Sequence, residues 1–316
     1  EENKIDLDKS IDTYFPTLSN ADKITIKQLL SHRSGIPNFT DDASYMSWYT
    51  QPKTEQEMMH IISNAGSDFA PGSKAEYSNS NYVILTFILE KAYGKNFAQL
   101  LEEYITKPLN LQNTYLGRQI DPTKKESKSY KYVDSWQPQQ ETDISVPLGA
   151  GGIVSTPIDL VHFNEALFNG KLITPQSLAM MTTINDNFGL GLFKIPFYDK
   201  IGFGHTGGID AFSSTNSYFP DSKISFALTS NGSNYNNNIA IAVLSAVYDK
   251  PFEVPIFSNY TVSSSELDQY VGLYSSKDIP LKITISKDNT TLIAQATGQP
   301  SFPLEATAKN IFKFEQ

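Results

Sequence analysis

A tyrosine and an asparagine two residues apart are the first side chains in this sequence that are able to support chemistry. The segment Glu76-Tyr77-Ser78-Asn79 stands before an apolar run, Val83 to Tyr93, that ends at Gly94, a common helix stop. Tyr77 and Asn79 are therefore expected on a loop at a helix N-terminus, where free amide groups and the helix dipole favour negative charge. Because a tyrosine normally loses its proton only near pH ~10, this position would help Tyr77 act as a phenolate.

A histidine followed by glycines forms a second chemical segment. His205-Thr206-Gly207-Gly208 leads into the strand-like residues 211–219. Glycines allow a ligand or another backbone to approach a strand closely, and His205 offers a donor or a cation beside them. The segment therefore predicts a binding edge. Structural interpretations stay open: Ser78 or Asn79 as a simple helix cap, Tyr77 as a packed ring, His205 as a strand histidine, and the glycines as a bulge.

With both segments in view, the chain resembles the β-lactamase-related serine hydrolases, which include class C β-lactamases, D-alanyl-D-alanine peptidases and related esterases. Tyr77-Ser78-Asn79 is similar to the family's Tyr-x-Asn, and His205-Thr206-Gly207 to its Lys/His-x-Gly. Three further segments are similar in the same order: residues 24–37, 149–160 and 228–232.

The resemblance implies a role for each matching residue. Tyr77 and His205 are the expected catalytic residues: Tyr77 would relay protons, and His205 would orient Tyr77 or bind a substrate carboxylate. Asn79, Thr206, Gly207 and Gly208 are the expected substrate-binding residues. Of these, Asn79 would hold an amide and Gly208 would give an amide to the oxyanion.

The chain departs from the family pattern because none of its serines is followed by a lysine three positions later. The family's nucleophile is thus not among these residues. We expect the 316 residues to be part of a longer protein in which a Ser-x-x-Lys segment precedes Glu1.

Composition narrows the class of protein. A net charge of -9 argues against nucleic acid as a partner, since it requires a basic face. The sequence has no cysteine, and its four histidines (His32, His60, His162 and His205) lack metal-ligand spacing, so we expect neither a metal nor a cofactor. We interpret His32 as structural. No apolar run approaches the ~20 residues that span a bilayer.

The order of elements predicts an α+β fold with an antiparallel sheet flanked by helices, as in the β-lactamase/transpeptidase-like folds. Capping signals place helices after Thr54 and Thr156, and period-two runs between Phe188 and Ser230 place successive strands. Residues 117–147 lack periodicity and are expected to form a wall or lid of the substrate cleft.

Two domains are expected, 1–250 and 251–316. The second is similar to the small lipocalin-like β domain of some relatives. Its roughly four predicted strands are too few for the usual eight of a barrel, so we expect it to be incomplete.

The predicted function is that of a serine hydrolase that forms an acyl-enzyme with a β-lactam, a D-amino-acid peptide or a small ester. The alternative is a catalytically inactive relative that binds peptide or glycan. The resemblance also implies a secreted or periplasmic location in a bacterial envelope; the sequence leaves the oligomeric state open.

Overall fold

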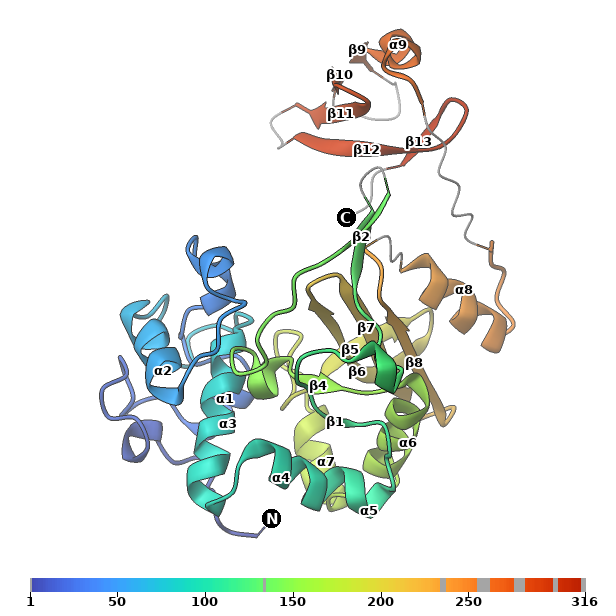
Figure 1. Ribbon diagram of the computed structural model, residues 1–316. Helices are drawn as coiled ribbons and strands as arrows, with labels where there is room; N and C mark the ends of the chain where they lie inside the picture. The colour runs from blue at the N-terminus through green and yellow to red at the C-terminus, as the bar shows by residue number, and fades with distance from the viewer. Residues whose placement is uncertain are drawn as a thin grey trace. The chain divides into compact units, whose positions relative to one another are not determined.

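The structure is a computed structural model that describes residues 2–132, 135–233, 237–254, 262–275, 282–297 and 301–313. The chain divides into two compact units, Glu1–Tyr235 and Asn236–Gln316, each of which Figure 1 shows. The domain boundary predicted near residue 250 differs from this division, which assigns helix α8 (Asn238–Val247) to the second unit. That predicted boundary stays a prediction.

Helices of the first unit gather around a long central helix, α3 (Figure 1). The α-helices of this unit are α1 (Ile26–Leu30), α2 (Glu55–Asn64), α3 (Asn79–Tyr93), α4 (Phe97–Leu101), α5 (Lys107–Leu109), α6 (Pro157–Phe168) and α7 (Pro175–Thr182). Short 3-10 segments include η2 (Phe39–Asp41), η3 (Tyr45–Ser47) and η6 (Leu148–Ala150).

Buried apolar residues pack α3 against its neighbours. Ile84 and Ile88 of α3, Leu29 of α1, and Met58 and Ile62 of α2 are each at most 1% exposed and belong to one hydrophobic core. The predicted helix ends are confirmed: Thr54 and Glu57 form a capping box before α2, and Gly94 closes α3 in the left-handed conformation, with φ 64°. This packing fixes the N-terminus of α3, where Tyr77 and Asn79 lie.

The sheet of the first unit has four antiparallel strands in the order β5-β6-β7-β8. Its strands are β5 (Phe193–Phe197), β6 (Lys200–Ile209), β7 (Phe212–Phe219) and β8 (Ile224–Ser230). Helix α6 packs on the sheet, and the Phe168 ring stacks on Tyr218 of β7 with their centroids 4.4 Å apart. Strands were expected at residues 188–195, 201–205, 211–219 and 224–230. All four exist, although β5 begins only at Phe193 and β6 continues to Ile209.

Smaller strands complete the first unit. Strands β1 (Tyr115–Leu116) and β4 (Ile153–Val154) pair with each other, as do β2 (Tyr130–Tyr132) and β3 (Trp136–Pro138). The segment predicted to lack periodicity therefore contains a short hairpin, and Tyr130 of that hairpin forms a parallel bridge to Gly232.

Two helices differ from what the sequence indicates. The helix that begins after Asn96 was expected to reach about Ile105 and to be stopped by Lys107-Pro108-Leu109. It instead runs without a break through α4, a π-turn (Glu102–Thr106) and α5, so Pro108 lies in its last turn, and it ends at Asn110 with φ 54°. Helix α7 was not predicted, although Thr174 caps it and Pro175 opens it.

The second unit contains α8, α9 (Ser264–Leu267) and one antiparallel sheet in the order β13-β12-β11-β10-β9. Its strands are β9 (Gly272–Tyr274), β10 (Ile283–Asp288), β11 (Thr291–Ala296), β12 (Ser301–Ala308) and β13 (Ile311–Lys313). Asp288-Asn289 is a residue pair that favours a hairpin turn, and it lies at the turn between β10 and β11, where Asn289 adopts φ 50°. Strand β12 was not predicted.

The observed architecture confirms the α+β class, with an antiparallel sheet and helices in the first unit and a small sheet in the second. Among the described residues, every helix is too short or too polar to cross a bilayer.

Candidate active site

Tyr77 lies on the loop before α3, and Asn79 is the first residue of that helix. The helix N-terminus is held by the loop after α1: Asn38 Oδ1 accepts from the Asn79 amide at 3.0 Å. Ser78 occupies the capping position, but its side chain makes no capping bond and donates instead to the Pro37 carbonyl at 3.2 Å. The interpretation of Ser78 as a side-chain helix cap is therefore wrong, and Asn38 takes that role through the Asn79 amide.

The Tyr77 phenol is neutral in this environment. Its hydroxyl donates to Asn79 Oδ1 at 3.2 Å, and burial raises the pKa of Tyr77 above its ordinary value. Our expectation that the helix N-terminus favours the phenolate is wrong. The amides that were to stabilise the anion are already occupied, since Asn79 donates to Asn38 and Ser78 donates to His32.

His205 lies on β6, with the centroid of its ring 6.1 Å from that of Tyr77. Phe193 of β5 stacks on the imidazole at 4.1 Å. Nδ1 of His205 bonds to the Thr206 carbonyl, so Nδ1 carries a proton and Nε2 remains as an acceptor. Burial lowers the pKa of His205, so the ring is mainly neutral at pH 7 rather than a cation.

His32 is the residue near the site whose place the sequence did not indicate. It is 2% exposed, and its ring lies 4.4 Å from that of Tyr77. The Ser78 amide donates to His32 Nδ1 at 3.1 Å, which requires this nitrogen to be unprotonated. Burial, with a smaller contribution from the neighbouring His205, lowers the pKa of His32 to about 4. His32 thus supports both the ring and the backbone of the Tyr77 segment.

The other predicted residues line an open stretch of strand. Pairing between β5 and β6 ends at Phe193 and Gly204, so β6 has no partner on that side from His205 onward in the described sheet. Thr206, Gly207 and Gly208 are exposed along this stretch. A Cβ added at Gly208 would meet no atom nearer than the Phe212 carbonyl oxygen at 4.0 Å. The strand therefore offers free backbone groups beside Tyr77 and His205.

The segment expected as a cleft wall ends near this strand. Thr142 donates to the Asp210 carboxylate at the turn after β6, and the Asp143 amide donates to the Tyr49 carbonyl at 3.0 Å. The Lys53 amide donates to Ser145 Oγ at 2.8 Å. Residues 142–145 thus connect the β6–β7 turn to the loop of residues 49–53, which supports the wall interpretation.

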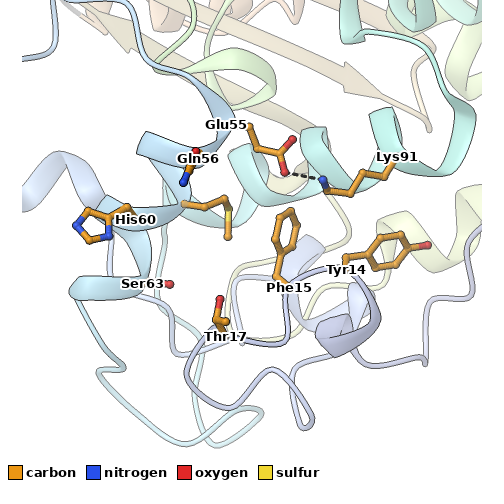
Figure 2. Close-up of a pocket in the computed structure, with 9 residues that line it drawn as sticks. Tyr14, Phe15, Thr17, Glu55, Gln56, His60, Ser63 and Lys91 are labelled. Atoms are coloured by element: carbon orange, nitrogen blue, oxygen red, sulfur yellow. Dashed lines mark ion pairs between the residues drawn. The ribbon is translucent and has the colours of Figure 1, made fainter.

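A separate groove of about 650 Å³ lies between α2, the end of α3 and the N-terminal segment (Figure 2). Glu55 and Lys91 form an ion pair of 2.6 Å in it. The groove shares no lining residue with the Tyr77–His205 site. Among the described residues, no three His, Asp or Glu side chains are arranged to hold a metal ion.

The fold and the paired motifs define a β-lactamase/transpeptidase-like protein. The Beta-lactamase family profile matches residues 1–247, and the chain belongs to this family. It is 25% identical to penicillin-binding protein 4* of Bacillus subtilis over 326 residues, which covers 92% of this chain and 70% of that protein.

Two other relatives have D-amino-acid substrates in their names. The chain is 25% identical to a teichoic acid D-alanine hydrolase of Staphylococcus aureus over 177 residues, 56% of this chain and 43% of that protein. It matches the structure of a D-amino acid amidase from Ochrobactrum anthropi with a TM-score of 0.70 and 27% identity, covering 78% of each chain.

Proposed function

We propose that the protein is a serine hydrolase that forms an acyl-enzyme on substrates with a D-amino-acid acyl group. The observation that carries this proposal is the 6.1 Å separation of the Tyr77 and His205 rings, with the Tyr77 hydroxyl bonded to Asn79. The D-alanine hydrolase and D-amino acid amidase relatives support this substrate class.

In this proposal, each site residue has a defined task. A serine attacks the substrate carbonyl as its proton passes to a base, and Tyr77 gives a proton to the leaving amine or alcohol as the scissile bond breaks. Asn79 holds the substrate amide, and the Gly208 amide contributes to the oxyanion site. Thr206 and Gly207 provide the strand edge along which the substrate lies.

The neutral states of Tyr77 and His205 refine the expected chemistry. A phenol with a raised pKa acts as a proton donor first and needs a neighbouring cation to act as a base. A neutral imidazole binds a substrate carboxylate poorly, and burial keeps His205 neutral at pH 7. The site therefore suits amide and ester substrates that lack a free carboxylate beyond the scissile bond.

The second candidate is a catalytically inactive protein that binds peptide or glycan. The observation in its favour is that the 316 residues contain no Ser-x-x-Lys. Under this alternative, the same cleft would recognise a ligand without acylation.

A hydrolysis screen separates the two candidates. Protein from the complete reading frame is tested with a chromogenic β-lactam, a D-alanyl-D-alanine peptide, a D-amino acid amide and a small aryl ester. We expect turnover of the D-amino acid amide, and we expect it to fall strongly in Tyr77→Phe. Absence of turnover with all four substrates would favour the binding protein. A location in the bacterial envelope accompanies the proposal, since the substrate class belongs to cell-wall chemistry.

A further inference from the structure

Two phenylalanines lie beside the candidate catalytic pair. Phe193, at the start of β5, stacks on the His205 imidazole with ring centroids 4.1 Å apart and an interplanar angle of 28°. The Phe193 ring also meets the Tyr77 ring edge-on at 6.1 Å. Phe188 meets Phe193 edge-on at 5.4 Å and lies 5.0 Å from the His32 ring. Phe188, Phe193 and His205 thus form one contiguous set of rings next to Tyr77, called here the aromatic surface.

Paired backbone fixes the aromatic surface at the beginning of the open strand. Phe193 pairs with Gly204, and in the described sheet this is the last pair of β5 and β6 before the open stretch that starts at His205. Phe188 forms an antiparallel bridge to Phe193. Because both phenylalanines stand on hydrogen-bonded backbone, their rings keep a defined position relative to His205.

The rings of the aromatic surface are only partly covered by protein. Phe188, Phe193 and His205 are each half-buried, and Tyr77 is 37% exposed. A core ring of the same sheet is different, since Phe219 on β7 is 1% exposed. Contiguous apolar surface beside convergent polar groups is typical of a ligand site. The aromatic surface is therefore available to a bound molecule.

The charge of these rings decides which chemical group they suit. Burial lowers the pKa of His205 and raises the pKa of Tyr77, so both rings are mainly neutral at pH 7. Arg33, which follows His32 in the chain, is already paired with Asp186. A carboxylate placed against these rings would exchange its hydration for apolar contacts, whereas an aromatic group gains both burial and ring contacts.

The contacts of Tyr77 decide which part of a substrate reaches the aromatic surface. In the proposed reaction the leaving atom accepts the Tyr77 proton, so it comes within about 3 Å of that hydroxyl. Asn79 accepts from the hydroxyl and is assigned to the acyl part of the substrate. Of the rings that contact Tyr77, His32 is 2% exposed and is covered, which leaves Phe193 and His205. The substituent on the leaving atom therefore meets these two rings.

We propose that Phe193, supported by Phe188, binds an aromatic leaving group, so that the protein prefers D-aminoacyl amides and esters of aromatic amines and alcohols to those with a small alkyl leaving group. The inference rests on the proposed function for the reaction at this site, and it adds the identity of the leaving group. The ring of the leaving group packs on Phe193 while Tyr77 donates its proton to the nitrogen or oxygen that departs.

Binding of two small probes tests this inference without requiring turnover. D-alanine benzylamide and D-alanine methylamide share the acyl group and differ only in the leaving group. Their dissociation constants are measured by NMR titration on protein from the complete reading frame, in which any reactive serine is replaced by alanine so that the probes are not consumed. We expect the benzylamide to bind about tenfold more tightly than the methylamide, and Phe193→Leu to reduce this ratio by about threefold or more.

Two further variants separate recognition from structure. Phe193→Tyr keeps the ring and should keep the ratio of the two dissociation constants within about twofold of the unsubstituted site. Phe197→Leu makes the same change as Phe193→Leu at a buried position further along β5, and it should lower stability without changing the ratio. Equal affinity of the unsubstituted site for both probes would overturn the inference. A ratio that Phe193→Leu leaves intact, or that Phe197→Leu lowers as much, would also overturn it.

Labelling of the complete protein by a serine reagent distinguishes failure of this inference from failure of the proposed function. If the benzylamide preference depends on Phe193 but a fluorophosphonate does not label the protein, the aromatic subsite stands and the hydrolase proposal fails. If labelling occurs but the benzyl group gives no preference, the hydrolase proposal stands and the aromatic subsite is contradicted.

Discussion

His32 determines the environment of Tyr77 more than the helix dipole does. Its ring covers one face of the phenol, and its Nδ1 occupies the Ser78 amide, a donor that would otherwise favour an anion at the helix N-terminus. Both histidines of the site are kept neutral by burial. The candidate site is thus a set of neutral donors and acceptors that requires an incoming cation or base to generate a phenolate.

Stability should depend on the protonation of His32. The folded state holds its pKa near 4, below the ordinary 6.5, so the unfolded state takes up the proton first as the pH falls. The contribution of neutral His32 to the free energy of unfolding is complete above pH 6.5 and is lost as the pH falls towards 4. At about 1.4 kcal/mol per pKa unit, this contribution amounts to roughly 3 kcal/mol.

Chemical denaturation at several pH values checks this prediction. His32→Asn is the matched variant, because asparagine tolerates the observed φ of 55° and keeps an acceptor for the Ser78 amide. We expect the variant to lose less stability than the wild type between pH 6.5 and 4. Parallel curves for the two proteins would contradict the assigned state of His32.

Removing the Tyr77 hydroxyl should affect turnover and not stability. We expect Tyr77→Phe to lower kcat by about 10²–10⁴, the range for loss of a proton-transfer group. Tyr82→Phe, in the first turn of α3, is the control, since its hydroxyl donates to the Leu30 carbonyl at 2.8 Å. The control should lose about 1 kcal/mol of stability and retain turnover. Steady-state kinetics and thermal unfolding of both variants give the result; a Tyr77→Phe enzyme with normal kcat removes Tyr77 from proton transfer.

The sequence predicted which residues meet at the site better than it predicted their states. The spacing of Tyr77 and Asn79, the glycines after His205 and the family resemblance together predicted two segments that the structure brings to one place. The charge state of Tyr77 was not predictable, because it depends on burial, and the ring of His32 that packs on Tyr77 lies 45 residues away in the sequence. His32 was interpreted as a structural residue, and its burial agrees with this interpretation. Its ring contact with Tyr77 shows that it also supports the candidate site.

At the level of elements, β6 carries His205 and the glycines of the site, and the close approach of its backbone to that of β7 depends on Gly204. A Cβ at Gly204 would lie 1.9 Å from the Asn216 carbonyl oxygen and 2.7 Å from Ser217 Cα, which are backbone atoms of β7. Gly208, on the same strand, has open space at the same position.

A pair of alanine substitutions tests this asymmetry. Gly204→Ala forces the two strands apart and should destabilise the fold by about 1–3 kcal/mol, the usual cost of overpacking. Gly208→Ala should leave the free energy of unfolding within about 0.5 kcal/mol of the wild type. Urea denaturation of the two variants is the measurement, and equal losses would show that β6 does not approach β7 in this way.

Elements with strong local signals were predictable, and those that depend on context were not. The capping box of α2, the threonine cap and first-position proline of α6, and the glycine after α3 made those helices predictable. Pro108 was expected to stop its helix at once, but the helix passes through a π-turn at Glu102–Thr106 and continues to Leu109, and a π-turn has no clear signal in the sequence. Strand β12 was missed because Pro303 falls in its middle, a residue that argues against a strand by sequence.

At the scale of the whole molecule, the two units differ in what the sequence could indicate. The order of motifs predicted the α+β class of the first unit, and the family profile over residues 1–247 shows the family to which the chain belongs. The described residues of the second unit form five strands in one antiparallel sheet where roughly four were expected, and a lipocalin-like fold stays a prediction. Its strands are short and its apolar positions few, so local patterns carry little information on their pairing.

The central claim is that Tyr77 and His205 serve a reactive serine. Its most direct test is the rate of labelling by a fluorophosphonate, followed by intact-mass analysis of protein from the complete reading frame. The proposal predicts one covalent adduct, on the serine of a Ser-x-x-Lys, that forms at least about a hundredfold more slowly in Tyr77→Phe and is protected by a D-amino acid amide. No adduct, or an adduct whose rate ignores the Tyr77 substitution, would contradict the hydrolase assignment.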